Sequence, residues 1–231
     1  MFTPFACSLL LAARSPFEYT DFKFEGWTTH VEKKLIATRP NLWKAVQTEL
    51  NLQLVSIERV VPDAPLAKLK TIPIWIRLND PGNICAAFHP DASWLQAHAM
   101  DPQMAHGFEI GNAENFVSWT YEQPWMILHE LSHGYQFLYM PKGFENPDVK
   151  AAYAAAMAAK RYDQVRHWNG AVVKAYATTN PMEYFAETTE AYFGTNDFYP
   201  FVRGELITAD PDGYTLMQKI WGPPQKRIPK N

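Results

Sequence analysis

The clearest hydrophobic pattern in the chain lies in residues 125–140, where apolar side chains occur on nearly every side of a helical projection. Gly134 is the only helix-breaking residue inside this run, and Pro124 and Pro141 bound it. Proline is tolerated in the first turn of a helix and ends a helix that it follows. A helix that is apolar all round belongs in the interior of a protein. The pattern therefore predicts a buried helix over most of this run.

Other periodic segments predict a small sheet before this helix and further helices after it. The segments expected to be helical are 40–54, 91–100, 180–193 and 210–222, and those expected to be extended are 72–78, 86–88 and 107–119. Pro73 places its strand at a sheet edge or at the start of that strand. The order predicts an α+β protein, with a small mixed sheet lobe over about 15–122, a mainly helical lobe over about 123–231, and a cleft between them.

A hairpin is also expected in the second lobe. Residues 165–168 and 171–176 flank Asn169-Gly170, a dipeptide that suits a type I′ turn. Tyr176 is then predicted to end the second strand of this hairpin, a short distance before the helix that begins after Asn180. An aromatic residue in a strand often packs in a core, so a packing role for Tyr176 stays an alternative.

The buried helix contains the sequence His129-Glu130-Leu131-Ser132-His133, which has the pattern H-E-x-x-H. Histidines four positions apart lie on one face of a helix, at the spacing at which two imidazoles can bind one zinc ion. Glu130 lies near the open position of such a zinc, where a general base is needed. Two core histidines beside a surface glutamate are the alternative, but burial of such groups without a partner is costly.

A catalytic zinc needs a third protein ligand. Gln136 and Tyr139 occupy the glycine and histidine positions of the longer three-histidine motif, so that motif is excluded. The downstream candidates are Glu145, His167, Glu183, Glu187 and Glu190, and the last three share one face of the predicted helix. We predict Glu183 as the ligand, with Glu187 as an alternative and Glu190 as a structural or outer-shell residue. Glu183 also fits a capping box with Asn180, in which it would only bond the backbone.

These motifs resemble those of the gluzincin metallopeptidases of the anthrax lethal factor catalytic-domain type. In that family H-E-x-x-H is followed about fifty residues later by a tyrosine and, seven positions on, by a glutamate in an E-[YF]-F-A-E sequence. Here Tyr176 precedes Glu183 by seven positions, and residues 183–187 read Glu-Tyr-Phe-Ala-Glu. The likeness covers about 124–193, and the remainder of the chain resembles small secreted bacterial relatives of the family.

The resemblance implies a zincin-like fold and a peptidase, expected to be an endopeptidase, with one Zn²⁺. It implies that His129, His133 and Glu183 bind the metal and that Glu187 is an outer-shell carboxylate. It further implies that the hydroxyl group of Tyr176 stabilises the transition state. Independently of the resemblance, His167 in the expected hairpin is the competing proton donor. Two other functions stay open, namely an inactive zinc-binding module with this fold and a zinc hydrolase that acts on a non-peptide bond.

Length, composition and charge agree with this interpretation. A chain of 231 residues with 47% hydrophobic content is long enough to bury a large core in one domain. The net charge of -3 and the absence of a basic cluster argue against nucleic acid or an anionic membrane as a partner. We expect a monomer, and the resemblance implies a polypeptide substrate.

The N-terminus predicts export. Residues 1–14 contain a short apolar run that resembles the core and cleavage zone of a signal peptide, although no basic residue precedes it. The run is too short to span a membrane. We predict a periplasmic or secreted protein, with a buried N-terminal segment in a cytoplasmic protein as the alternative. Cys7 would leave with the signal peptide, and Cys85 alone cannot form an intrachain disulfide.

Overall fold

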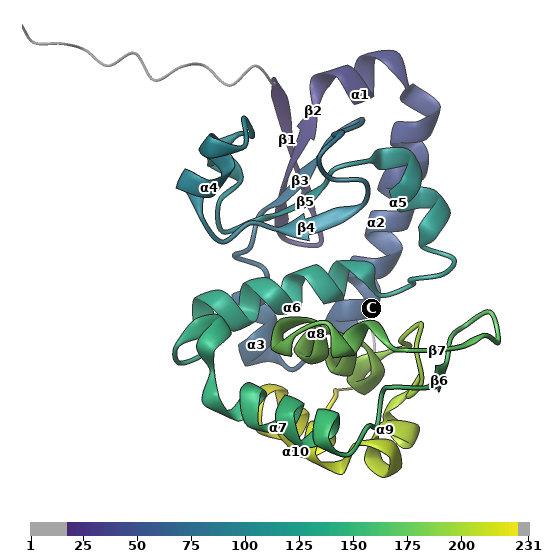
Figure 1. Ribbon diagram of the computed structural model, residues 1–231. Coiled ribbons are helices and arrows are strands. Elements are labelled where there is room, and N and C mark those ends of the chain that lie inside the picture. Colours follow the sequence, from purple (N-terminus) through teal and green to yellow (C-terminus); the bar gives the residue numbers. More distant parts are fainter. Residues whose placement is uncertain (1–17, 226–231) are drawn as a thin grey trace, which may run out of the picture.

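The computed structural model describes residues 18–225 and shows a mixed α+β chain with a small sheet and mostly helices (Figure 1). The predicted signal peptide, residues 1–14, lies outside the described residues. The strands are β1 (Tyr19–Phe24), β2 (Trp27–Glu32), β3 (Ile74–Ile76), β4 (Ala86–Phe88), β5 (Phe108–Ile110), β6 (Val165–Arg166) and β7 (Val172–Val173). The α-helices are α1 (Lys33–Thr38), α2 (Pro40–Val60), α3 (Asp63–Leu69), α4 (Ala92–Ala97), α5 (Ala113–Trp119), α6 (Met126–Tyr139), α7 (Pro147–Ala158), α8 (Pro181–Phe193), α9 (Arg203–Ala209) and α10 (Pro211–Trp221). Short 3₁₀ turns are η1 (Pro102–Met104), η2 (Gly143–Glu145) and η3 (Tyr176–Thr178).

The main sheet has five strands in the order β1-β2-β3-β5-β4, so β4 lies at one edge. β2, β3 and β5 are parallel, whereas β1 and β4 each pair antiparallel to their neighbour. On either side of β4, the carbonyl of Cys85 accepts from Gly111 and the backbone N–H of His89 donates to Gly107. Because antiparallel residues alternate in direction, the main-chain groups of Ala86 and Phe88 point away from β5.

Helix α6 runs between the sheet and the later helices, and α8 packs beside it (Figure 1). A Cβ atom at Gly134 would lie 2.8 Å from Cδ1 of Ile72 and 3.1 Å from the ring of Phe88, so glycine permits the close approach of α6 to the sheet. One hydrophobic core extends from Trp27 on β2 to Trp221 on α10 and joins the two halves of the chain. Within residues 18–225, no helix is long and apolar enough to cross a membrane.

Most of the expected helices are confirmed. The buried helix is α6, and α10 occupies the last predicted helical segment. Asp91 caps α4 and Asn180 caps α8, each through its side chain. The helix expected over 40–54 continues to Val60.

One expectation for the first half of the chain needs correction, and one of the two alternatives for Pro73 is confirmed. Residues 107–119 are extended only at β5, and α5 follows because the side chain of Asn112 accepts from the backbone N–H groups of Glu114 and Asn115. Pro73 directly precedes β3, which lies inside the sheet, so this proline marks the start of a strand and not an edge.

The predicted hairpin is present but shorter than expected. The backbone N–H of His167 donates to Ala171, and that of Gly170 donates to His167, so the loop has three residues and no two-residue type I′ turn. Gly170 has a φ of 87°, a left-handed conformation that suits the last position of such a loop. Tyr176 does not end the second strand. It begins η3, because the chain has already left the β6–β7 ladder at Val173.

Candidate metal centre

A cavity of about 530 Å³ lies between β4 of the sheet and the two helices α6 and α8. Its wall includes every residue that the sequence analysis assigned to the site: His129, Glu130, His133, Tyr176, Glu183, Glu187 and Glu190. Residues of β4, together with Trp119, Met126 and Phe144, supply an apolar part of the wall. The fold therefore brings together in one cavity residues that lie more than fifty positions apart in the sequence.

Helix α6 presents His129 and His133 side by side, with ring centroids 4.8 Å apart. The start of α6 is held from the sheet side, since the backbone N–H of Ile127 donates to the side chain of Gln53 on α2 at 3.0 Å. A buried helix with a fixed first turn holds both imidazoles in place before any ligand binds.

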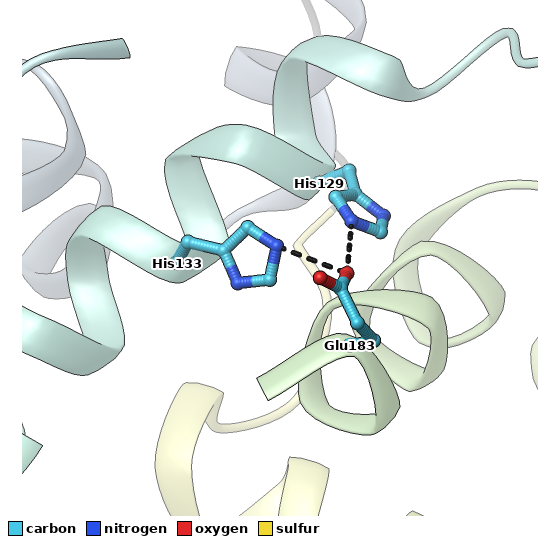
Figure 2. A group of neighbouring side chains, drawn as sticks. All are labelled: His129, His133 and Glu183. Atoms are coloured by element: carbon cyan, nitrogen blue, oxygen red, sulfur yellow. Dashed lines mark hydrogen bonds and ion pairs between the residues drawn. The ribbon is translucent and has the colours of Figure 1, made fainter. Parts of the chain in front are cut away.

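Helix α8 supplies the carboxylate that faces these imidazoles. Asn180 caps the helix by accepting from the backbone N–H groups of Met182 and Glu183 at 2.8 and 2.9 Å. The side chain of Glu183 points across to α6 instead of back to the cap (Figure 2). Its Oε2 atom lies 3.0 Å from Nε2 of His129 and 3.2 Å from Nε2 of His133. The capping-box interpretation of Glu183 is therefore wrong.

The three side chains form a group that can bind a metal ion. Their ligand atoms all lie within 4.8 Å of one another. Bond lengths of about 2.0 Å in a tetrahedral zinc site place neighbouring ligand atoms roughly 3.3 Å apart, close to the observed 3.0 and 3.2 Å. Two imidazoles and one carboxylate are also a suitable donor set for that ion.

Two further carboxylates lie behind His129. Oε1 of Glu190 lies 2.7 Å from Nδ1 of His129, whereas Oε1 of Glu187 is 3.8 Å from the same atom. The second oxygen of Glu187 accepts from Asn196 at 3.1 Å. The resemblance implied that Glu187 is the outer-shell carboxylate, and Glu190 was predicted to be a structural or outer-shell residue; of the two, Glu190 makes the direct hydrogen bond. His129, Glu187 and Glu190 also form a second group of close ligand atoms, which shares its histidine with the first.

The electrostatics of this cluster favour a cation. Burial raises the pKa of Glu187 and of Glu190, and the charge of Glu190 raises that of Glu187 further. Burial acts in the same direction on Glu183, but hydrogen bonds to His129 and His133 hold its pKa well below the ordinary value. Burial lowers the pKa of His129, and the carboxylates of Glu183 and Glu190 outweigh this and raise it well above the ordinary value. Positive charge among these carboxylates is therefore stabilised.

The two remaining predicted residues also border the cavity. Glu130 is 8% exposed and follows His129 on α6. Tyr176 is 47% exposed, and its ring centroid lies 6.3 Å from that of His129. Burial raises the pKa of the Tyr176 hydroxyl, and the charge of Glu183 adds to this effect, so the hydroxyl keeps its proton. His167, the competing donor, is not among the described residues that line the cavity, and its Nε2 atom lies 3.6 Å from Asp197.

Sequence reasoning missed the residues that hold β4 against the cavity. Glu109 on β5 is fully buried, and its Oε2 atom lies 3.2 Å from Nδ2 of Asn83 and 3.1 Å from Nε2 of His89. Its other oxygen accepts from Arg77 at 3.1 Å. Asn83 and His89 stand on either side of β4, so one carboxylate fixes both ends of the edge strand. The sequence contained one indication of this role, since Glu109 stands between the apolar residues Phe108 and Ile110. A charged side chain in an apolar strand needs hydrogen-bonding or ionic partners.

The site thus combines a histidine pair from α6, a carboxylate from α8 and an edge strand in one cavity. The i, i+4 spacing of the histidines and the Asn180 cap are local features of the chain, whereas the Glu109 hydrogen bonds that fix the edge strand connect residues about twenty positions apart or more. Comparisons with protein-family models, with curated proteins and with solved structures find no match for this chain.

Proposed function

We propose that this protein is a zinc-dependent peptidase with a zincin-like fold. In this proposal His129, His133 and Glu183 bind one Zn²⁺, Glu130 is the general base, and Tyr176 stabilises the oxyanion. The observation that carries the proposal is the convergence of three ligand atoms, with separations of 3.0 and 3.2 Å to Oε2 of Glu183, on the wall of a cavity that also contains Glu130.

The number of ligands favours a catalytic site over a structural one. Structural zinc sites usually have four protein ligands, whereas catalytic sites keep one position for water or substrate. Among the described residues, no fourth His, Cys, Asp or Glu joins the group of His129, His133 and Glu183. The group borders the cavity, so a substrate can reach it.

The chemistry follows from the positions of the side chains. Zinc, when bound, polarises the carbonyl group of the substrate and lowers the pKa of a water molecule. Glu130 accepts a proton from the attacking water and passes it to the leaving nitrogen as the carbon–nitrogen bond breaks. Tyr176 donates a hydrogen bond to the carbonyl oxygen, and this bond becomes stronger as negative charge develops there.

The edge strand favours a polypeptide over other substrates. Ala86 and Phe88 line the cavity, and their main-chain groups point away from β5. An extended peptide can add to such an edge through main-chain hydrogen bonds, which hold it without reading its sequence. A polypeptide presents alternating donors and acceptors at the spacing that these groups require.

A cleavage assay with metal analysis tests the proposal. Zinc-loaded wild-type protein is incubated with a mixed peptide library, and the products are identified by mass spectrometry. We expect cleavage and about one zinc per chain. Glu130→Gln should retain zinc and lose activity by about a hundredfold or more, whereas His133→Ala should lose zinc as well.

Glu114→Gln is the matched control, since it removes an exposed carboxylate on α5 that pairs with Arg39. This variant should retain both zinc and activity. Absence of cleavage by zinc-loaded wild-type protein would refute the peptidase, and full zinc occupancy of His133→Ala would refute the metal site.

A further inference from the structure

Four exposed apolar side chains either line the cavity or lie in segments close to it. The exposed fractions are 84% for Tyr121, 64% for Ile84, 47% for Tyr176 and 40% for Trp168. We call these four residues the apolar rim. Single exposed apolar residues are ordinary, but a group of them beside a cavity is typical of a binding surface.

The apolar rim continues the wall of the cavity. Ile84 and Tyr176 line the cavity themselves. The rings of Tyr121 and Trp168 are in edge contact, with centroids 5.9 Å apart and planes at 88°. Tyr121 lies in the loop between Trp119 and Gln123, both of which line the cavity.

Hydrogen bonds hold the apolar rim to the elements that build the site. The carbonyl of Ile84 accepts from the side chain of Asn115 on α5 at 2.6 Å. The backbone N–H of Trp168 donates at 2.8 Å to the carbonyl of Asp197, in the segment that follows α8. The rim is therefore positioned relative to β4 and to the metal-binding group, as a subsite requires.

The charge of the cavity limits what can occupy this surface. Of the described residues that line the cavity, none is Lys or Arg, and Glu130, Glu183, Glu187 and Glu190 are carboxylates. The wall therefore provides no Lys or Arg side chain that could pair with a phosphate group or an acidic side chain. A neutral polypeptide segment with large apolar side chains fits both the charge of the cavity and the surface of the rim.

We infer that the apolar rim binds a bulky aromatic or aliphatic side chain of an extended polypeptide substrate, and that Tyr121 and Trp168 determine this specificity. The inference rests on the proposed function, because it takes the substrate to lie along β4. The substrates are then extended, non-acidic segments that have one large apolar residue near the cleaved bond.

Binding without cleavage tests this inference independently of the chemistry. The probes are labelled ten-residue peptides of Gly, Ala, Ser and Thr in which one phenylalanine is moved along the sequence, and a matched set with alanine in its place. Affinity for zinc-loaded Glu130→Gln protein is measured by fluorescence anisotropy. We expect at least one phenylalanine position to bind about fivefold or more tightly than its alanine match, since an added aromatic contact has an effect of this size.

Tyr121→Ala and the double variant Tyr121→Ala/Trp168→Ala, each made in Glu130→Gln protein, should reduce or abolish this preference, with a larger loss of affinity for the phenylalanine peptides than for the alanine peptides. Trp94→Ala is the matched control, because Trp94 is 51% exposed on α4 and does not line the cavity. Tyr121→Ala changes a largely exposed side chain and should fold normally. It therefore still tests the inference if the double variant misfolds.

The results separate the two proposals. The inference is overturned if Glu130→Gln protein with an intact apolar rim shows no preference for phenylalanine. It is also overturned if the preference persists in the double variant. A preference that disappears in the double variant and persists in Trp94→Ala supports it. If that pattern occurs while zinc-loaded wild-type protein cleaves none of the peptides, the peptidase fails and the apolar subsite stands. If the peptides are cleaved with no effect of the rim variants on binding, the peptidase stands and the subsite fails.

Discussion

Nδ1 of His129 lies 2.7 Å from Oε1 of Glu190, while Nε2 of the same ring faces Glu183. In the proposed zinc site, a carboxylate at Nδ1 keeps the proton on that nitrogen and leaves the lone pair of Nε2 for the metal. Glu190 then orients a side chain on another helix and increases its strength as a ligand.

This relationship predicts unequal effects of the two carboxylates behind His129. Glu190→Gln keeps the shape of the side chain and removes its charge, so zinc affinity should fall by about tenfold or more. Glu187→Gln should have a smaller effect, because Glu187 lies 3.8 Å from Nδ1. Competition with a coloured chelator measures both affinities. A larger loss in Glu187→Gln would contradict this assignment.

Tyr176→Phe tests the oxyanion donor. Loss of a hydroxyl group that acts only in the transition state should lower kcat by about a hundredfold and leave zinc content and KM nearly unchanged. Tm should change little, because Tyr176 is half-exposed. Kinetics and thermal melting of the same preparation check both statements. Full activity with a lower Tm would make Tyr176 a packing residue, and His167 would then be the next donor to test.

Glu109→Gln tests the support of the edge strand. A neutral amide holds Asn83 and His89 less firmly, so β4 should lose its fixed position and KM for peptides should rise more than kcat falls. Zinc content should be unchanged. Stability should also fall by about 1–3 kcal/mol, because Glu109 is buried and accepts from Arg77. Kinetics well below Tm separate the two effects, and an unchanged KM there would reject the positioning role.

We predict that the thiol of Cys85 is unreactive in the folded protein. Burial raises its pKa from 9.0 to about 12, and the charge of Glu130 adds to this shift. Near pH 8.5, iodoacetamide should therefore modify the folded protein about a hundredfold or more slowly than the urea-unfolded chain. The comparison needs Cys7→Ser protein, so that only Cys85 reacts. Equal rates would show that the thiol is accessible and ionised.

The sign of the linked stability change follows from the same shift. The unfolded chain releases the Cys85 proton near pH 9.0, and the folded protein releases it near pH 12. The contribution of this group to stability is complete below the first value and is lost as the pH rises toward the second. Cys85→Ser should therefore flatten the dependence of Tm on pH above about pH 9.

The close approach of His129, His133 and Glu183 could be predicted from the sequence because its determinants are local. The spacing of His129 and His133 fixes their common helix face, and the cap at Asn180 fixes the start of the helix that presents Glu183. Which carboxylate meets Nδ1 of His129 depends on the rotation of α8 relative to α6. That rotation is set by long-range packing, which no single segment encodes.

The sheet was harder to predict than the helices. β4 has three residues and only small or aromatic side chains, so its place at the cavity depends on pairing with β5 far along the chain. The prediction that residues 107–119 are extended was wrong because it followed the apolar residues of this segment. It did not take into account that Asn112 can cap a helix. Tyr176 was placed in the right region but in the wrong element, since the hairpin ladder ends early.

The open edge of β4 also bears on self-association. Exposed strand edges are where copies of a protein stack into continuous sheets and aggregate. Here the outward-facing positions are Ala86, Phe88 and, in the same alternation, Pro90, which has no N–H to donate. Within β4 itself, a second copy would find two N–H donors, both on residues that line the cavity. The strand is thus short enough to resist polymerisation while it stays accessible to a single flexible chain.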